Sequence, residues 1–226
     1  MNTDVSHQKL VLTARYWLLG MAAHDSSYYK VLDAMEYMLQ RHTAERNGGD
    51  IESVHQLRIF QHLRTLHNHI SSPQVKYMAA FLHDTVEDKN VSVQEIEALF
   101  GAEVAYTVDL LSKEVLGVKK DLTLYLPNVF KDENASVVKL GDRNDNISTM
   151  VGVFKPERLL RYFNETKDEY LPRIKEARRR FPHQEAAYEN LKLGIANQLK
   201  LIQTIIKMQE AGAEIPSNVR NIKDQA

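Results

Sequence analysis

Apolar residues recur three and four positions apart along most of the chain, which is the spacing that places them on one face of an α-helix. The clearest example is the series Leu57, Phe60, Leu63, Leu66 and Ile70. Only nine glycines and six prolines interrupt the 226 residues. The pattern predicts an all-α protein with helices over about 5–23, 28–45, 54–70, 74–88, 92–99, 101–113, 121–131, 133–150, 155–180 and 183–211.

Local motifs mark where several of these helices begin. The stretch SVQE at 92–95 is a capping box, in which the serine side chain accepts a hydrogen bond from the backbone three residues on. Pro156 marks another start, since proline is tolerated in the first helical turn. The loop RNGGD at 46–50 is too short for a domain linker. We therefore expect one domain over 1–226, with a core at about 28–150, C-terminal helices at 155–211 and a polar tail at 212–226.

Composition changes the predicted fold little, but it limits the kinds of partner and metal site that we expect. Hydrophobic residues make up 43% and charged residues 26%, as in soluble globular proteins, and the net charge is −1. No strong field attracts nucleic acid or an anionic membrane, and the arginine run at 178–180 is interpreted as a solvated helix face. No apolar run approaches the ~20 residues of a spanning helix, so we expect a cytoplasmic protein. Because there is no cysteine, any metal site must use imidazole and carboxylate.

One segment departs from the amphipathic pattern. In FLHDTVEDKN, at 81–90, an apolar helix leads directly into one histidine and three carboxylates. Acidic residues are disfavoured at the C-terminal end of a helix by roughly 0.3–1 kcal/mol each, so the cluster suggests a missing cation. At 100° per residue, His83 and Glu87 share one stripe and Asp84 and Asp88 the adjacent one. We expect all four side chains to project from a single edge.

Two further segments offer the additional ligands that a metal ion would need. His55 lies near the start of an amphipathic helix in SVHQLR, and Asp142 follows the apolar run of VVKLGDRNDN at 137–146. Imidazole and carboxylate together suit Mn²⁺, Fe²⁺, Zn²⁺ or Mg²⁺. The predicted ligands are therefore His55, His83, Asp84 and Asp142, which leave positions open for water and substrate. Asp145 is an alternative to Asp142, and His62 could flank the same site.

Simpler interpretations stay open for each of these residues. The pair His24-Asp25 lacks a second pair of carboxylates one turn later and is interpreted as a helix terminus. The segment 83–88 could likewise be a solvated helix end that forms salt bridges with Lys89. The remaining histidines are expected to be surface residues or satisfied, partly buried ones, namely His42, His62, His67, His69 and His183.

The order of these motifs resembles a known family. His83-Asp84, with His55 before and Asp142 after, is similar to the HD superfamily of metal-dependent phosphohydrolases. HDTVED, the pair FG at 100–101, LLSK at 110–113 and VVKLGDRNDN resemble the hydrolase domain of the RelA/SpoT alarmone enzymes, where the stretches run close to HDVIEDT, FG, TK and IKLADRLHN. The resemblance covers about 28–150. It implies an HD-domain helical bundle with a C-terminal helical extension.

The resemblance also implies functions for individual residues. It makes His55, His83, Asp84 and Asp142 the ligands of one Mn²⁺, although another divalent metal would also suit them. Glu87 and Asp88 match the acidic pair that positions water and handles protons.

Four further residues match positions that bind substrate in the family. Arg46 matches a basic residue of the guanine pocket, Asn146 the asparagine near ribose and phosphate, and Lys113 the lysine after the FG helix. Arg143 is either a counter-charge for substrate or an anchor for Asp142.

The chain also departs from the family at several positions near the nucleotide. Asn47 stands where a second basic residue is common, and Ser148 where an arginine is common. Asn144 and Asp145 replace the usual Leu-His. The predicted metal ligands are all present, so these departures bear on which nucleotide is bound and not on the hydrolytic centre.

The expected activity is hydrolysis of (p)ppGpp to GDP or GTP and pyrophosphate, in a hydrolase without the family's synthetase and regulatory domains. One alternative is an HD-type nucleotidase or pyrophosphohydrolase acting on another nucleotide. Another is a non-catalytic nucleotide-sensing or interaction protein. The helices at 155–211 could form a homodimer seam, and the basic residues at 155, 158, 161 and 167 are expected on a solvated face and not at a pyrophosphate.

Overall fold

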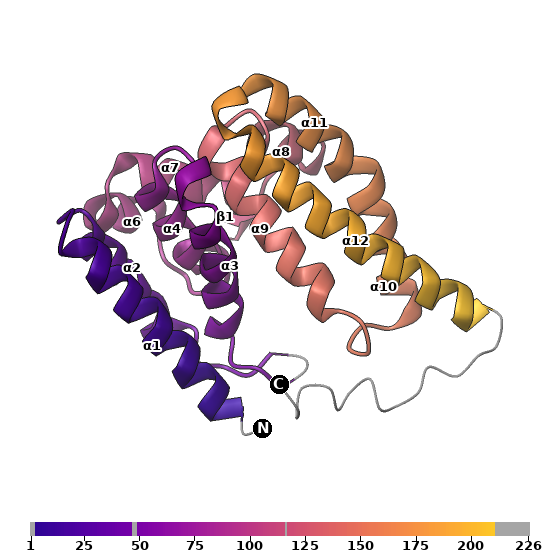
Figure 1. The fold of residues 1–226 in the computed structure, drawn as a ribbon, viewed down its shortest axis with the longest axis horizontal. Helices are drawn as coiled ribbons and strands as arrows, with labels where there is room; N and C mark the ends of the chain where they lie inside the picture. Colours follow the sequence, from indigo (N-terminus) through magenta and orange to yellow (C-terminus); the bar gives the residue numbers. More distant parts are fainter. Residues whose placement is uncertain (1–2, 47–48, 116, 211–226) are drawn as a thin grey trace.

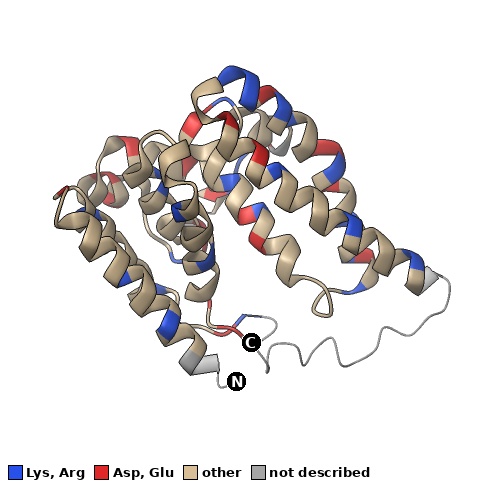
Figure 2. Cartoon of the chain, viewed as in Figure 1, with Lys and Arg blue, Asp and Glu red and all other residues tan. Residues whose placement is uncertain are grey.

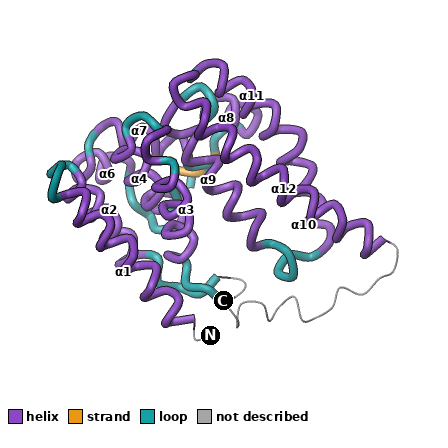
Figure 3. The backbone as a smooth tube through the Cα atoms, in the orientation of Figure 1, coloured by secondary structure: helices purple, strands orange, loops and turns teal. Residues whose placement is uncertain are grey.

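The computed structural model describes residues 3–46, 49–115 and 117–210, and most of these residues are helical (Figures 1 and 3). In chain order the α-helices are α1 (Thr3–Ala22), α2 (Tyr28–Arg41), α3 (Ser53–Thr65), α4 (Pro73–Leu82), α5 (Thr85–Asp88), α6 (Val93–Phe100), α7 (Ala102–Leu111), α8 (Leu122–Val129), α9 (Glu133–Thr149), α10 (Pro156–Glu165), α11 (Leu171–Arg180) and α12 (Glu185–Glu210). Two short 3₁₀ helices are η1 (His67–His69) and η3 (Pro182–Gln184), and η2 (Thr166–Tyr170) is a π-helical segment.

Three helices, α3, α4 and α9, pack on one another at the centre of the molecule. Helices α1 and α2 cover one side of this centre, and α10, α11 and α12 lie on the other side, where α12 runs along α9 (Figure 1). The apolar face predicted for α3 is buried, since Leu57, Phe60 and Leu63 have no exposed area. Burying apolar side chains supplies most of the driving force for this arrangement, so the centre is a rigid support for the polar residues at its edge.

The sequence motifs place several helix starts correctly. The Ser92 side chain accepts from the Glu95 backbone N–H at 3.1 Å, which begins α6 as the capping box predicts. Pro156 occupies the first turn of α10. Asp132 caps α9 by accepting from the N–H groups of Asn134 and Ala135 at 2.9 and 2.7 Å. The last of these caps orients the helix that carries Asp142.

The predicted helix over 74–88 is wrong in one respect, because it is broken at its functional residues. Helix α4 ends at Leu82 and α5 begins at Thr85. The ring N–H of His83 donates to the carbonyl of Ala80 at 3.0 Å, and this carbonyl is the one that Asp84 N–H would use in a continuous helix. Asp84 lies at φ −90° and ψ −6°, in the sparsely populated region where active-site residues are often found. The 100° spacing therefore does not extend from His83 to Asp88.

Other predicted boundaries also shift. Helix α2 ends at Arg41 rather than near 45, and the chain then forms a bridge between Glu45 and Ile51 that closes the following loop. After α7, a two-stranded antiparallel hairpin that the periodicity does not reveal is formed by β1 (Glu114–Val115) and β2 (Val118–Lys119). The predicted helix at 155–180 is continuous over 156–180, but it passes through the π-helical segment η2 between α10 and α11. The predicted tail at 212–226 lies outside the described residues.

Charged residues of both signs are spread over the outer helices (Figure 2). In the arginine run, Arg179 and Arg180 are exposed and Arg178 pairs with Glu189, as expected for a solvated helix face. None of the described helices combines the length and apolar character that crossing a membrane requires.

Candidate metal centre

Separate parts of the fold bring the predicted ligands together. His55 comes from the first turn of α3, His83 and Asp84 from the break between α4 and α5, and Asp142 from the middle of α9. One ligand atom each from His55, His83 and Asp84 lies within 4.8 Å of the others, so these three residues could hold a metal ion. Asp142 Oδ1 joins them, at 3.2 Å from His55 Nε2 and 4.0 Å from His83 Nε2.

The Nε2 atom of His83 faces this cluster without a hydrogen-bond partner among the described residues. Its Nδ1–H donates to the Ala80 carbonyl, so in the neutral ring the lone pair is on Nε2. That Nε2 is buried and has no hydrogen-bond partner among the described residues, and it lies 3.1 Å from Asp84 Oδ1. A lone pair that faces a carboxylate oxygen away from water is unfavourable unless a cation lies between them. The arrangement therefore fits a metal ion.

His55 uses both of its ring nitrogens. Its Nδ1 lies 2.7 Å from Asp145 Oδ2, while Nε2 faces Asp142 and, at 3.9 Å, Asp84. Burial opposes protonation of the ring, but hydrogen bonds to Asp142 and Asp145 outweigh it and raise the pKa of His55 to about 9. The cluster thus attracts positive charge, which a proton supplies when no metal ion is bound. Metal binding would displace that proton.

The ligand carboxylates are held in their ionised form by neighbouring donors. Burial raises the pKa of Asp142, but the ammonium of Lys139, at 2.8 Å from Asp142 Oδ2, and the nearby histidines hold this pKa well below its usual value. Asn146 Nδ2 also donates to Asp142 Oδ1. Gln56 Nε2 donates to Asp84 Oδ2 at 3.2 Å. Both aspartates are therefore fixed in direction and available as ligands.

The predicted acidic pair lies beside this cluster. Glu87 and Asp88 belong to α5 and are exposed, and the Glu87 carboxylate accepts from the backbone N–H of Lys113 at 3.0 Å. Although Asp88 reaches solvent, crowding by protein atoms raises the pKa of its carboxyl to about 6, and the charges of Asp84 and Glu87 add to the rise. Asp88 can therefore exchange a proton near neutral pH.

Two of the predicted substrate-binding residues contact each other and the metal cluster. Arg46 Nη2 donates to Asn146 Oδ1 at 3.4 Å, and Asn146 in turn donates to Asp142. The third, Lys113, is half-buried at the start of the hairpin, where its ammonium lies 5.7 Å from the centre of the Tyr125 ring. Arg46 and Asn146 thus form the side of the site nearest the loop at 46–50.

Arg143 has different surroundings from the other predicted substrate-binding residues. Its guanidinium is buried, donates to Glu165 at 2.9 Å and lies 4.0 Å from the centre of the Tyr170 ring. These contacts are with Glu165 and Tyr170, whereas we expected from the sequence a counter-charge for substrate or an anchor for Asp142. Arg143 thereby joins α9 to α10 and η2.

The sequence did not reveal the residues that support the ligands. Asp145, predicted as an alternative ligand, contacts the ring nitrogen of His55 that points away from the cluster. Lys139 could have been found, because a lysine inside the apolar run VVKLGD suggests a buried partner three residues on. Gln56 and Arg58 carry no comparable signal, since polar residues in the first turns of a helix are common.

Of two hollows on the described surface, the smaller one adjoins the metal cluster. It has a volume of about 260 Å³ and lies between α3, α9 and α12, where it is lined by Arg58, Gln61, His62, Gly141, Asn144, Asp145, Ser148 and Gln198. His62 therefore flanks the site on this side and is bonded to Asn144 and Asn190. Three of the positions that depart from the family pattern face this hollow.

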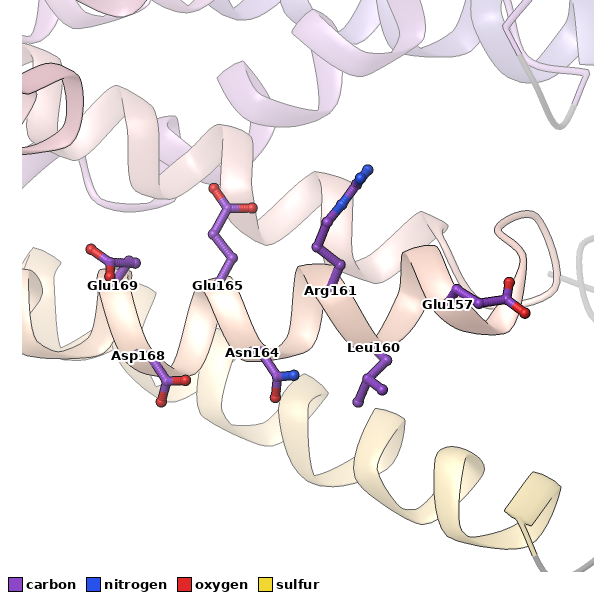
Figure 4. A pocket seen from close by; sticks show the side chains of 7 residues that line it. All are labelled: Glu157, Leu160, Arg161, Asn164, Glu165, Asp168 and Glu169. Carbon is purple, nitrogen blue, oxygen red and sulfur yellow. The ribbon is translucent and has the colours of Figure 1, made fainter. Parts of the chain in front are cut away.

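The larger hollow, of about 590 Å³, follows α10 and η2 and contains none of the predicted ligands (Figure 4). Figure 4 shows Arg161 and Glu165 on one side of the helix and Asn164 and Asp168 on the other. Four of the seven lining residues are acidic, namely Glu157, Glu165, Asp168 and Glu169. Their repulsion makes this hollow a poor site for a polyphosphate.

Outside the cluster, the other His-Asp pair behaves as expected. His24 and Asp25 lie between α1 and α2, and Asp25 accepts from the backbone N–H of Ser27 at 2.9 Å. His42, which is buried, lies 3.5 Å from the Thr85 hydroxyl, and His67 lies 3.1 Å from the Tyr77 hydroxyl. These histidines are satisfied without a metal ion.

Comparison with known proteins agrees with the resemblance. No protein-family model matches the chain. It is 33% identical over 149 residues to the GTP pyrophosphokinase rsh of Brucella melitensis, covering 62% of this chain and 19% of that protein. It is 33% identical over 135 residues to a probable guanosine-3′,5′-bis(diphosphate) 3′-pyrophosphohydrolase of Synechocystis sp., covering 56% and 17%. The match to the Spiroplasma citri pyrophosphohydrolase is 27% over 168 residues, covering 70% and 21%.

These alignments involve only a part of each relative, since the chain spans about a fifth of their length. Among solved structures, a metazoan ortholog of SpoT that hydrolyses ppGpp matches with a TM-score of 0.58 and 22% identity, covering 76% of this chain and 94% of that one. The predicted all-α, HD-type fold is thereby confirmed. The chain is homologous to a region of the Rsh/SpoT proteins and has the helical fold of a metazoan SpoT ortholog.

Proposed function

We propose that this chain is a metal-dependent phosphohydrolase that removes pyrophosphate from the 3′ position of (p)ppGpp and yields GDP or GTP. The observation that carries the proposal is the buried Nε2 of His83, which has no hydrogen-bond partner among the described residues and faces Asp84 and Asp142. Homology to proteins described as ppGpp 3′-pyrophosphohydrolases supports the choice of substrate.

The donor set fits a divalent ion such as Mn²⁺. Two imidazole nitrogens and two carboxylates would hold it, from His55, His83, Asp84 and Asp142, and they leave further positions open. A divalent ion bound there supplies Lewis-acid chemistry, since it neutralises phosphate charge and lowers the pKa of water toward ~7. The surrounding residues would bind the nucleotide and hold or transfer protons.

In the proposed reaction, the oxygen of water bonds to the phosphorus next to the 3′ oxygen, and the bond between that phosphorus and the 3′ oxygen breaks. The 3′ oxygen keeps the electron pair and takes up a proton, so that the nucleoside hydroxyl is restored. Asp88, whose pKa is raised to about 6, can hold a proton in this cycle, and Glu87 is its neighbour. Arg46 and Asn146 would bind the nucleotide beside the cluster.

The positions that depart from the family pattern lie apart from the Arg46–Asn146 pair. The family departures at Asn144, Asp145 and Ser148 face the hollow between α3, α9 and α12, whereas Arg46 and Asn146 bond to each other near Asp142. The departures therefore leave the Arg46–Asn146 pair in place. Asn47, the remaining departure, lies outside the described residues.

The test is an assay of the purified protein with and without Mn²⁺ against ppGpp, pppGpp, their adenosine analogues and common mononucleotides. We expect pyrophosphate from the 3′ side only when metal is present. Orthophosphate from a 5′-monophosphate would indicate a nucleotidase instead. Metal binding without turnover of any nucleotide would indicate a sensing protein.

A matched variant completes the test. Asp84→Ala should abolish turnover even in excess Mn²⁺, because it removes one ligand and the partner of Gln56. The helical circular dichroism of the variant should match that of the wild type, because Asp84 is only half-buried. A fully active Asp84→Ala protein would overturn the assignment.

A further inference from the structure

A carboxylate from α9 holds the outer side of His55. Asp145 Oδ2 lies 2.7 Å from His55 Nδ1, and the Asp145 side chain is only 8% exposed. Because a carboxylate is an acceptor, the contact requires the ring proton on Nδ1 in neutral His55, and Nε2 then carries the lone pair that points at Asp142 and Asp84. Asp145 thus selects the tautomer that a metal ligand needs.

The second oxygen of the same carboxylate is held from α3. Arg58, one turn after His55, places Nε 2.9 Å from Asp145 Oδ1, an ion-pair contact without the geometry of a hydrogen bond. His55 and Arg58 therefore bind the two oxygens of Asp145 from one helix. A buried carboxylate is costly unless it is paired; the ion pair with Arg58 compensates the charge of Asp145, and the hydrogen bond with His55 Nδ1 orients it.

Arg58 also reaches the loop that carries Arg46. Its Nη1 lies 3.2 Å from Asp50 Oδ2, and the backbone of Asp50 accepts from Arg46 N–H at 2.8 Å. The contacts therefore run without interruption from the metal-facing ring of His55, through Asp145 and Arg58, to the loop at one edge of the site. From the other side, Arg46 returns to Asn146 and Asp142.

We propose that Asp145 is a positioning residue that fixes the tautomer and orientation of His55, and that Arg58 holds Asp145 in place and ties it to the Arg46 loop. A carboxylate on the outer nitrogen of a metal-binding histidine raises the basicity of the inner one, and loss of such a partner weakens metal affinity by about 10–100-fold. The inference rests on the proposed metal-dependent function, but it concerns contacts that exist before any metal ion binds.

The experiment compares the wild type with Asp145→Asn, Asp145→Glu and Arg58→Met, with Asp168→Asn as control because Asp168 is an exposed aspartate of η2 (Figure 4). Calorimetric titration with Mn²⁺ should show affinity about 10–100-fold lower for Asp145→Asn. Arg58→Met should lose less, and Asp145→Glu should recover part of the affinity. The control should match the wild type.

Nitrogen NMR of the metal-free protein gives a readout that a general structural defect would not imitate. At a pH above about 9, where metal-free His55 is neutral, the wild type should show the ring proton on Nδ1, and Asp145→Asn should shift it toward a mixture of tautomers. Unchanged Mn²⁺ affinity together with an unchanged His55 tautomer would overturn the inference. If Asp145→Asn does not fold, the Arg58→Met protein decides by the same two measurements.

The same data separate this inference from the proposed function. A wild type that binds Mn²⁺ but hydrolyses no nucleotide would defeat the proposed function, while the affinity and tautomer changes would still support Asp145. If the wild type binds no Mn²⁺, the tautomer measurement alone decides.

Discussion

Helix α9 takes part in two buried lysine contacts, one at its N-terminal end and one at its middle, and the two lysines meet different partners. In the first half, Lys76 from α4 donates to Asn134 Oδ1 at 2.7 Å and to the Ser71 carbonyl at 2.6 Å. Near the middle of α9, its own Lys139 donates to the Asp142 carboxylate at 2.8 Å. The first lysine meets neutral acceptors, and the second meets a full negative charge.

The difference sets the direction in which the pKa of each lysine is shifted. Burial lowers the pKa of Lys76 to about 8, because neutral acceptors only partly replace water around an ammonium. Burial acts on Lys139 in the same direction, but the charge of Asp142 outweighs it and holds the pKa of Lys139 well above its ordinary value. The N-terminal end of α9 therefore serves the packing of the fold, whereas its middle holds a charged site.

The largest expected effect comes from removing the negative partner of Lys139. Asp142→Ala should abolish Mn²⁺ binding in calorimetry and lower the free energy of unfolding by about 3 kcal/mol, because a buried ammonium loses its partner. The double variant Asp142→Ala/Lys139→Met should recover most of that stability in chemical denaturation but none of the metal binding. Equal stabilities of the single and double variants would show that the pair is not charged as described.

The pH dependence of stability tests the other lysine. Folded Lys76 releases its proton near pH 8 and the unfolded chain near 10.5, so between these values the unfolded state binds more protons and the contribution of Lys76 to stability rises with pH. The gap corresponds to roughly 3 kcal/mol. Denaturation of the wild type and Lys76→Met at pH 7 to 10 should show the difference between them shifting in favour of the wild type. A constant difference would mean that Lys76 does not titrate in this range.

A smaller effect is expected where α9 meets α10. Arg143→Met loses the ion pair with Glu165 and the contact with the Tyr170 ring, and should lower the free energy of unfolding by about 2 kcal/mol. Mn²⁺ affinity and the KM for ppGpp should stay within twofold of the wild type. A raised KM with unchanged stability would assign Arg143 to substrate binding instead.

The sequence pattern was sufficient to predict the all-α fold and the residues that converge on the candidate metal centre. The spacing of apolar residues and the helix-capping residues located most helices, because amphipathic faces and capping side chains such as that of Ser92 are local signals. The sequence pattern placed His83 and Asp84 on one continuous helix. In the structure the helix breaks where the His83 ring donates to the Ala80 carbonyl. That contact depends on the side-chain rotamer of His83, which the spacing of residues does not reveal.

The supporting residues depended on tertiary geometry. Asp145 lies three positions after Asp142, so the sequence could place it near the site but could not say whether it faces the metal side or the outer side of His55. The pairing of Arg58 with both Asp145 and Asp50 requires the loop after Glu45 to fold back, which the bridge to Ile51 achieves. Such contacts between distant segments leave no periodic signal.

The smallest expected effect lies on the face of α9 toward α12, at a position where the family usually has leucine. Asn144 bonds to His62 Nδ1 at 3.0 Å and accepts from Gln198 Nε2 at 2.7 Å, so it joins three helices through polar contacts. Asn144→Leu leaves those partners without their bonds and should cost about 1 kcal/mol in chemical denaturation. Hydrolysis of ppGpp should stay within twofold, because Asn144 faces the hollow behind Asp145 and not the Arg46–Asn146 side. A large fall in kcat would instead mean that this polar junction transmits strain to His55 through Asp145.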